Sequence, residues 1–308
     1  MKKLVSTTIA ICVSALLMAQ TSANLKLNLE KNKTYRVKSK TEQNTTITIG
    51  GNIQQVETKT QTSISLKPIS VGDNFIVAEI RFDTTITKVS MPQMEINSTK
   101  TGSINSSNNA DVMNCIMNRF SKAVFNVRLS LSGKVMEISN LKAIADELTK
   151  SIDSLQGPMA AQKGQLAQMV GESAIKGSIE SITAYLPGKQ VNVGDKWDSN
   201  IKMSGGGMSM SITSNYKLKK ITGNQADIAA DVTIEPASQE PTVINGMPMT
   251  YDIRGLGKSN ITVDTKTGWM SKSSSKSHLQ GNMNIKAQGN DMQIPLEVDS
   301  NTEVIALP

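Results

Sequence analysis

The chain has 308 residues, a formal net charge of +7 and only 3% aromatic residues. Its lysines are scattered singly and aromatic rings are few, which excludes a stacking platform for single-stranded nucleic acid, so no nucleic-acid partner is expected. The length suffices for one hydrophobic core or for two joined half-domains.

The first 23 residues have the pattern of a secretory signal peptide. Lys2 and Lys3 precede an apolar run over residues 4–19 that is too short to span a bilayer, and cleavage is expected after Ala19 or Ala23. No later apolar run reaches transmembrane length. The sequence therefore predicts an exported chain, in the periplasm or outside the cell, with no integral membrane segment after processing.

Residues 24–138 predict a first set of antiparallel strands. The segment 45–65 alternates polar and β-branched residues around Gly50-Gly51-Asn52, which is typical of a hairpin, and its alternating Thr and Ser predict a face in water. The most apolar strand begins at Phe75 and is expected at the centre of this first sheet. An inserted helix is predicted at about 110–124, where Val112, Ile116 and Phe120 recur at helical spacing.

Residues 139–187 predict a helical linker. Leu141, Ile144, Leu148 and Ile152 form an apolar stripe, and a second helical stretch runs over about 159–186. That stretch contains glycines at 164, 171 and 177, which would let a sheet approach the helix backbone closely.

Residues 188–308 predict a second set of strands that resembles the first. The segment LKPISVGDNFIVAEI from Leu66 matches LKKITGNQADIAADV from Leu218, and the turn at Gly133 matches the turn at Gly268. Three prolines in 235–249 predict a loop without regular structure. The predicted fold class is α+β: two related antiparallel β-meander halves forming a curved sheet packed on central helices.

Catalytic chemistry is not indicated. His278 is the only histidine and lies in a polar strand, and Asp73 and Asp195 occupy Val-Gly-Asp turns where an aspartate hydrogen-bonds its own backbone. Cys115, on the inserted helix, is expected to be buried and inert. The sequence thus predicts no catalytic residues, no metal site, no cofactor and no enzyme activity.

Methionine is the unusual residue, with 17 in the chain. Met208 and Met210, and likewise Met247 and Met249, are spaced so that both members of a pair share one face of a strand. Thioethers suit Cu(I), and methionine also serves as a flexible core filler. The interpretation preferred here is a methionine-rich groove that adapts to apolar ligands.

Three motifs carry a family resemblance: Val193-Gly-Asp-Lys-Trp197, Asp264-Thr-Lys-Thr-Gly-Trp269, and the Ala-Gln end of the signal peptide. They resemble an uncharacterised secreted protein family of Bacteroidota. The layout is similar to envelope lipid carriers of the LolA and LppX type, in which a curved sheet half-encloses helices. That likeness implies a fold and a class of cargo but carries over no catalytic residue.

The resemblance also implies two candidate O-glycosylation sites. Asp83-Thr84-Thr85 and Asp153-Ser154-Leu155 resemble the Asp-Ser/Thr-apolar acceptor of that phylum, so Thr84 and Ser154 would carry the glycan.

The predicted function is the binding or carriage of an apolar or amphiphilic ligand, such as a lipid, in the cell envelope. The alternative is a structural or surface-interaction protein that contacts protein or glycan without a small-molecule pocket. An enclosed apolar space of about 300 Å³ or more separates the two.

Overall fold

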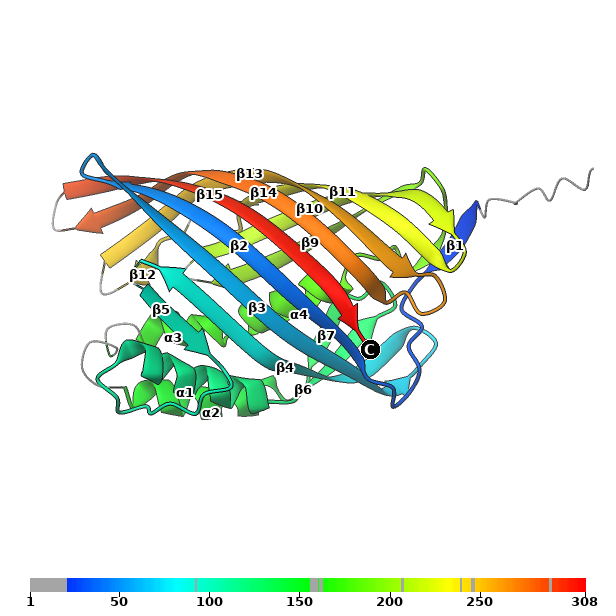
Figure 1. The fold of residues 1–308 in the computed structure, drawn as a ribbon, viewed down its shortest axis with the longest axis horizontal. Helices are drawn as coiled ribbons and strands as arrows, with labels where there is room; N and C mark the ends of the chain where they lie inside the picture. The colour runs from blue at the N-terminus through cyan, green and yellow to red at the C-terminus, as the bar shows by residue number, and fades with distance from the viewer. Residues whose placement is uncertain are drawn as a thin grey trace, which may run out of the picture.

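The computed structural model describes residues 21–308 except 92, 156–159, 161–162, 206–207, 239, 245–246 and 288–289. Most of these residues form a large, curved antiparallel sheet (Figure 1). In chain order its strands are β2 (Tyr35–Ile49), β3 (Asn52–Val71), β4 (Phe75–Ser90), β5 (Gln93–Asn97), β6 (Phe125–Ser130), β7 (Val135–Ile138), β9 (Lys196–Gly205), β10 (Met208–Thr222), β11 (Gln225–Pro236), β12 (Thr242–Ile244), β13 (Met247–Asp264), β14 (Met270–Ala287) and β15 (Asn290–Leu307).

The strand order is β7-β6-β4-β3-β2-β15-β14-β13-β11-β10-β9, with β5 paired to β4 and β12 paired to β13. The last strand, β15, therefore lies between β2 and β14 and joins the early strands to the late ones. On each side of β15 the strands follow one another as a simple antiparallel meander, β2-β3-β4-β6-β7 and β9-β10-β11-β13-β14.

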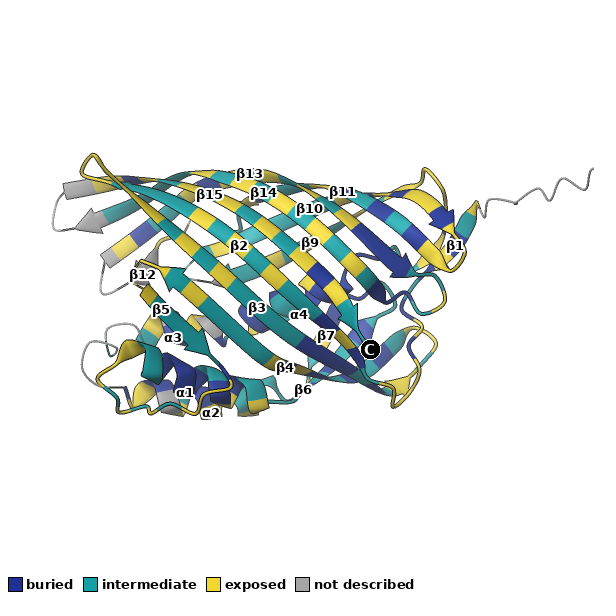
Figure 2. Cartoon of the chain, viewed as in Figure 1, coloured by how far each residue is buried: buried dark blue, intermediate teal, exposed yellow. Residues whose placement is uncertain are grey.

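Burial alternates along the strands, so the sheet has an inner and an outer face (Figure 2). On β10, Tyr216 and Leu218 are buried while Asn215 and Lys217 are exposed, as successive side chains of a strand point to opposite faces. The inner face is the one that carries these buried residues. The early strands do place one face in water, but it carries lysine, glutamate and glutamine, while the threonines at 58, 60 and 62 are half-buried on the inner face.

Threonine can face inward because hydroxyls pair across neighbouring strands. Thr60 Oγ1 lies 3.2 Å from Thr87 Oγ1, and Thr41 Oγ1 lies 3.0 Å from Thr302 Oγ1. Each pair satisfies hydrogen-bonding groups that burial would otherwise leave without partners.

The helices lie along one side of the curved sheet, beside its edges (Figure 1). They are α1 (Asn109–Lys122), α2 (Leu141–Asp153), α3 (Lys163–Met169) and α4 (Glu172–Thr183). α1 packs on β4 and β5, and α3 and α4 pack on β9. Among the described residues, none of the helices combines the length and apolar character that a membrane crossing requires.

Helix α4 spans the space between the two edge strands of the sheet, β7 and β9. Glu180 Oε1 accepts a hydrogen bond from the backbone N–H of Val135 on β7, at 2.9 Å. On the other side, a Cβ on Gly177 would lie only 2.4 Å from the carbonyl oxygen of Lys202 on β9. Gly177 thus permits the close approach expected of it, whereas a Cβ on Gly164 would meet no atom within 4 Å.

The segment after the predicted signal peptide is part of the folded core. β1 (Ser22–Leu25) pairs with β8 (Lys189–Asn192), and Leu25, Leu27 and Leu29 are buried. The N–H of Leu27 donates to Leu131 O at 2.8 Å, and that of Asn28 to Thr267 O at 2.9 Å, so this segment binds both of the turns that the sequence matched.

The predicted signal peptide, residues 1–23, lies mostly outside the described residues. Its last residue, Ala23, is buried and pairs with Val191 of β8. Cleavage after Ala23 would cut β1, whereas cleavage after Ala19 would leave β1 whole.

The structure corrects three details of the predicted fold. The helices flank the edges of the sheet and are not at its centre. The predicted helix over 159–186 is divided, and α4 begins after Gly171, because glycine weakens a helix interior. The proline-rich segment forms the short β12–β13 pairing, in which Pro248 lies near the start of its strand, a position that tolerates the missing N–H.

Candidate functional site

A cavity of about 470 Å³ lies between the C-terminal part of α4 and the inner face of the sheet. It is bounded by α4, β9, β10, β11, β13, β14, β15 and β2. The side chains that line it include Ser39, Thr41, Glu180, Ile182, Tyr185, Ser199, Ile201, Met203, Ile212, Ser214, Tyr216, Val232, Ile234, Ser259, Ile261, Met270, Ser273, Ser275, Ser277, Ser300, Thr302 and Val304.

The cavity has two chemically different walls. The apolar wall comes from β9, β10 and β11 and consists of Ile201, Met203, Ile212, Val232 and Ile234. The hydroxyl wall comes from β2, β14 and β15 and consists of Ser39, Thr41, Ser273, Ser275, Ser277, Ser300 and Thr302. The residues of both walls are half-buried, except Ile234, which is buried. Such a lining suits a molecule that has both apolar and polar parts.

Two polar groups in the cavity have unused hydrogen-bonding capacity. Ser199 Oγ is inaccessible to solvent and has no partner among the described residues. Glu180 is buried, its Oε1 accepts from Val135, and no ion pair with a cationic side chain is found for it in the described part of the chain. A buried polar atom without a partner costs free energy, which a ligand would recover if the Ser199 side chain rotated to bring its hydroxyl into the cavity.

Aromatic residues hold α4 against this end of the sheet. Tyr185 Oη donates to Gly268 O at 2.9 Å, and Trp197 Nε1 donates to Tyr185 O at 3.1 Å. Trp197 stacks on Tyr216 with ring centroids 5.7 Å apart. Burial raises the pKa of both tyrosine hydroxyls, so Tyr185 and Tyr216 stay neutral here at physiological pH.

The methionines predicted to form a groove lie beyond this cavity along the same strands. Met208 and Met210 are half-buried and share the inner-face parity of Ile212, and Met249 is buried on β13. The structure describes Met247 at the start of β13 but not its side-chain environment. The methionine that lines the cavity on β9 is Met203, the register partner of Met210.

The two candidate glycosylation sites differ in exposure. Thr84 is half-buried in the middle of β4, where it pairs with Ser63 of β3. Ser154 is exposed at the C-terminal end of α2.

The turn aspartates and the cysteine lie outside the cavity lining. Asp195 Oδ2 accepts from the backbone N–H of Asn192 at 2.8 Å, which is the turn role expected of it, and Asp73 is exposed at the β3–β4 turn. Cys115 is buried on α1, as predicted.

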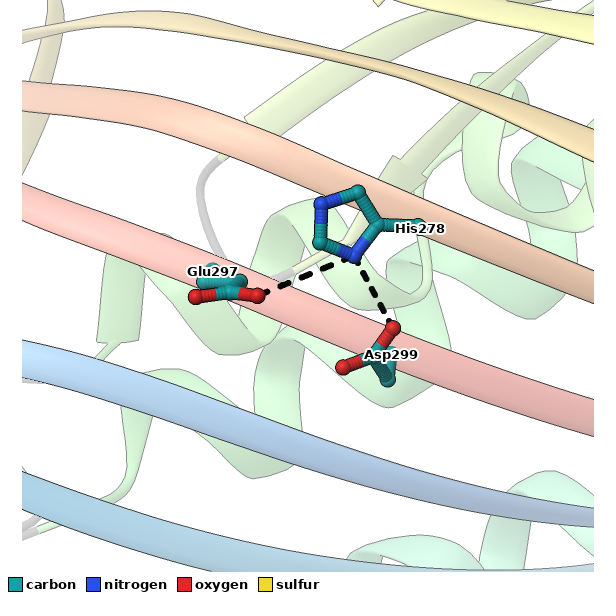
Figure 3. Close-up of side chains that lie close together, drawn as sticks. All are labelled: His278, Glu297 and Asp299. Carbon is teal, nitrogen blue, oxygen red and sulfur yellow. Dashed lines mark hydrogen bonds and ion pairs between the residues drawn. The ribbon is translucent and has the colours of Figure 1, made fainter.

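His278 has neighbours that the sequence did not indicate. It is exposed on the outer face of β14, and its Nδ1 lies 2.9 Å from Asp299 Oδ1 and 3.8 Å from Glu297 Oε1, both on β15 (Figure 3). The hydrogen bond with Asp299 is the main reason why the pKa of His278 is raised above its usual 6.5.

Sequence reasoning missed Ser199, Glu180, Met203 and the hydroxyl wall. The signal for the hydroxyl wall is present, because serines at 271, 273, 275 and 277 alternate with lysine, serine and lysine. This alternation predicts that one face of the strand is uncharged, but it does not distinguish a face exposed to water from a face that lines a cavity. Ser199 and Glu180 give no local signal, because they come together through contacts between α4 and β9.

Comparison with known protein families places the chain in one of them. Residues 73–270 match a family of unknown function, DUF6263, and the chain belongs to this family. No curated protein matches the chain.

Several solved structures resemble the chain at low similarity. Lipovitellin, from a study of its lipid–protein interactions, matches with a TM-score of 0.47 and 8% identity, covering 91% of this chain and 26% of its own. An outer membrane channel from Pseudomonas putida F1 matches with a TM-score of 0.26 and 8% identity. The match covers 92% of this chain and 98% of the channel. OccK2 (OpdF) of Pseudomonas aeruginosa matches with a TM-score of 0.24 and 5% identity. The match covers 90% of this chain and 99% of OccK2. This chain spans about a quarter of lipovitellin, and scores this low identify no function.

Proposed function

We propose that this protein binds an amphiphilic small molecule, such as a lipid, in the cavity between α4 and the inner face of the sheet, and that it does so as an exported, non-enzymatic protein. The observation that carries the proposal is the cavity itself. Its volume of about 470 Å³ exceeds the roughly 300 Å³ at which small-molecule sites begin.

The chemistry of the two walls favours an amphiphile over a purely apolar ligand. An apolar chain would bury surface against the isoleucines and Met203 of the apolar wall, at roughly 25 cal/mol per Å². A polar group would lie near the hydroxyl wall of β2, β14 and β15, and Ser199 on β9 and Glu180 on α4 offer further polar atoms elsewhere in the lining. A purely apolar ligand would leave these polar atoms without partners, which opposes its binding.

The direct test is to identify the molecules that the native protein carries when it is purified. The protein is purified from its native envelope, extracted with organic solvent, and the extract is analysed by mass spectrometry. We expect an amphiphile at one equivalent per chain. A clean extract from a folded protein would contradict the proposal.

Paired variants on β10 then test the location. Lysine at Ile212 places a charge in the apolar wall, and Ile212→Phe fills part of the cavity without a charge; both are expected to lose the bound amphiphile. Ser209→Lys puts the same charge on the exposed outer face of the strand and is the matched control. The double replacement of Met208 and Met210 by lysine tests whether the ligand extends beyond the cavity. Retention of the amphiphile by a folded Ile212→Phe protein would place the ligand elsewhere.

The second candidate function is interaction with another macromolecule through the outer face. Leu256 is 70% exposed there, in a hollow of about 830 Å³ that also contains Asp252, Arg254 and Glu297. A clean extract together with capture of a defined partner, lost on Leu256→Lys, would favour this function.

A further inference from the structure

We propose that His278, Glu297 and Asp299 form a binding site for a divalent first-row transition ion of the zinc type on the outer face of the sheet. The three side chains come from β14 and β15 and converge on one point (Figure 3). One imidazole nitrogen and two carboxylate oxygens lie within 4.8 Å of one another. This site is separate from the cavity, and its existence does not depend on the proposed function.

The distances between the donor atoms suit such an ion. Ligand atoms at about 2.0–2.1 Å from a tetrahedral zinc ion lie about 3.3 Å from each other. The two distances from His278 Nδ1, 2.9 Å to Asp299 and 3.8 Å to Glu297, fall on either side of that value. An ion can therefore be accommodated by small side-chain rotations, with Nδ1, which lies within 4 Å of both carboxylates, as the nitrogen ligand.

The sheet fixes the positions of the three side chains. His278 and Asp299 are register partners in the β14–β15 ladder, and Glu297 is two residues before Asp299, hence on the same face. Both strands are paired on each side, β14 with β13 and β15 with β2. Such strands hold ligands more rigidly than loops do, and a rigid site loses less entropy on binding.

The surroundings leave room for further ligands. The hollow on one side, about 650 Å³, is lined by His278, Asp299 and Asn44, and Asn44 of β2 is the register partner of Asp299. The second hollow, about 830 Å³, is lined by His278 and Glu297. Water, or the amide oxygen of Asn44, can fill the remaining coordination positions.

The donor set selects the class of ion. Calcium requires six to eight oxygen ligands and magnesium prefers octahedral oxygen, whereas imidazole with carboxylates suits zinc, copper and related ions. The carboxylates supply two negative charges, opposed on the same outer face by Lys276 of β14 and by Arg254 and Lys258 of β13. Arg254 is already engaged with Asp252 and Glu235.

The test is zinc binding by the full chain, prepared without a polyhistidine tag and titrated by calorimetry. We expect one zinc ion per chain at pH 7.5, with binding that weakens as pH falls through the His278 pKa, because a proton and the ion compete for Nδ1. His278→Ala and Glu297→Gln should each weaken binding by about tenfold or more. Calcium and magnesium at the same concentrations should not compete.

The matched control is Glu303→Gln, which removes the same charge from an exposed residue on the same face of β15. It should leave zinc binding unchanged.

His278 is exposed, so its replacement should not unfold the protein, and circular dichroism checks this. Because His278 is the only histidine, its imidazole resonances in NMR spectra report the ion directly. Absence of binding by the native chain, or equal binding by His278→Ala, would overturn the proposal.

Discussion

The first and second strand sets are both antiparallel meanders but differ in what covers their inner faces. In the first, the chain between β5 and β6 forms α1, and Phe120 of α1 packs against Phe82 of β4 and Phe125 of β6, with ring centroids 5.1 and 5.6 Å away. In the second, β12 ends at Ile244 and β13 begins at Met247, and the inner face borders the cavity. The inner face is thus covered directly by α1 in the first set and by α4, across a cavity, in part of the second.

This difference explains where a ligand would bind. Beside α1 the rings of Phe82, Phe120 and Phe125 contact one another, which is typical of a well-packed interior. Beside β9, β10 and β11, the side chains that line the cavity have open space between them and α4, so they are free to contact a ligand.

The largest expected effect comes from removing a buried side chain of α1. Phe120→Ala should lower the free energy of unfolding by about 3–5 kcal/mol, because it removes a buried ring and leaves a void. Met203→Ala, in the wall of the cavity, should cost only about 1 kcal/mol, because Met203 already lacks neighbours on one side. Urea denaturation measures both. Equal losses would mean that the two interiors are packed alike.

The next effect concerns the contact between α4 and β9, which borders the open region. Gly177→Ala should lower the free energy of unfolding by about 1–2 kcal/mol, because the new methyl group clashes with the Lys202 carbonyl and this cost exceeds the helix-propensity gain. Gly164→Ala, which meets no neighbouring atom, should raise stability by up to about 1 kcal/mol. Thermal unfolding of the two variants gives the comparison. A stabilised Gly177→Ala protein would show that α4 is not held closely to the edge strand.

The smallest effect concerns the open region itself. Ser199→Ala removes a buried hydroxyl that has no partner, so the ligand-free protein should keep its stability or gain up to about 1 kcal/mol. The same change should weaken amphiphile binding about fivefold, if the ligand supplies the missing hydrogen bond. Stability is measured on delipidated protein, and affinity by re-binding of the extracted amphiphile. A loss of stability without a loss of affinity would assign Ser199 a structural role.

Much of the strand and helix content follows from local patterns in the sequence. The apolar stripe at 110–124 corresponds to α1, and the apolar strand from Phe75 corresponds to β4, which lies in the middle of the first strand set. Gly133 and Gly268, which the sequence places in turns, both adopt positive φ. Such features depend on residues close together in the chain.

The candidate sites depend on residues far apart, which is why the sequence did not show them. Asp299 lies 21 residues after His278, and only the register of β14 and β15 brings them together. The closeness of Glu180 and Val135 likewise depends on how α4 lies between the sheet edges. Met208 and Met210 share the inner face of β10 with Ile212, but the cavity lies further along that strand.

The position of β15 has a consequence for how this chain acquires its structure. β15 follows every other strand in the sequence, yet it is the strand that pairs with both β2 and β14. Until residues 290–307 have been synthesised, the early and late strands have no common hydrogen-bonded neighbour. Assembly of the continuous sheet is therefore a late event that depends on contacts between distant residues, a pattern associated with slow folding.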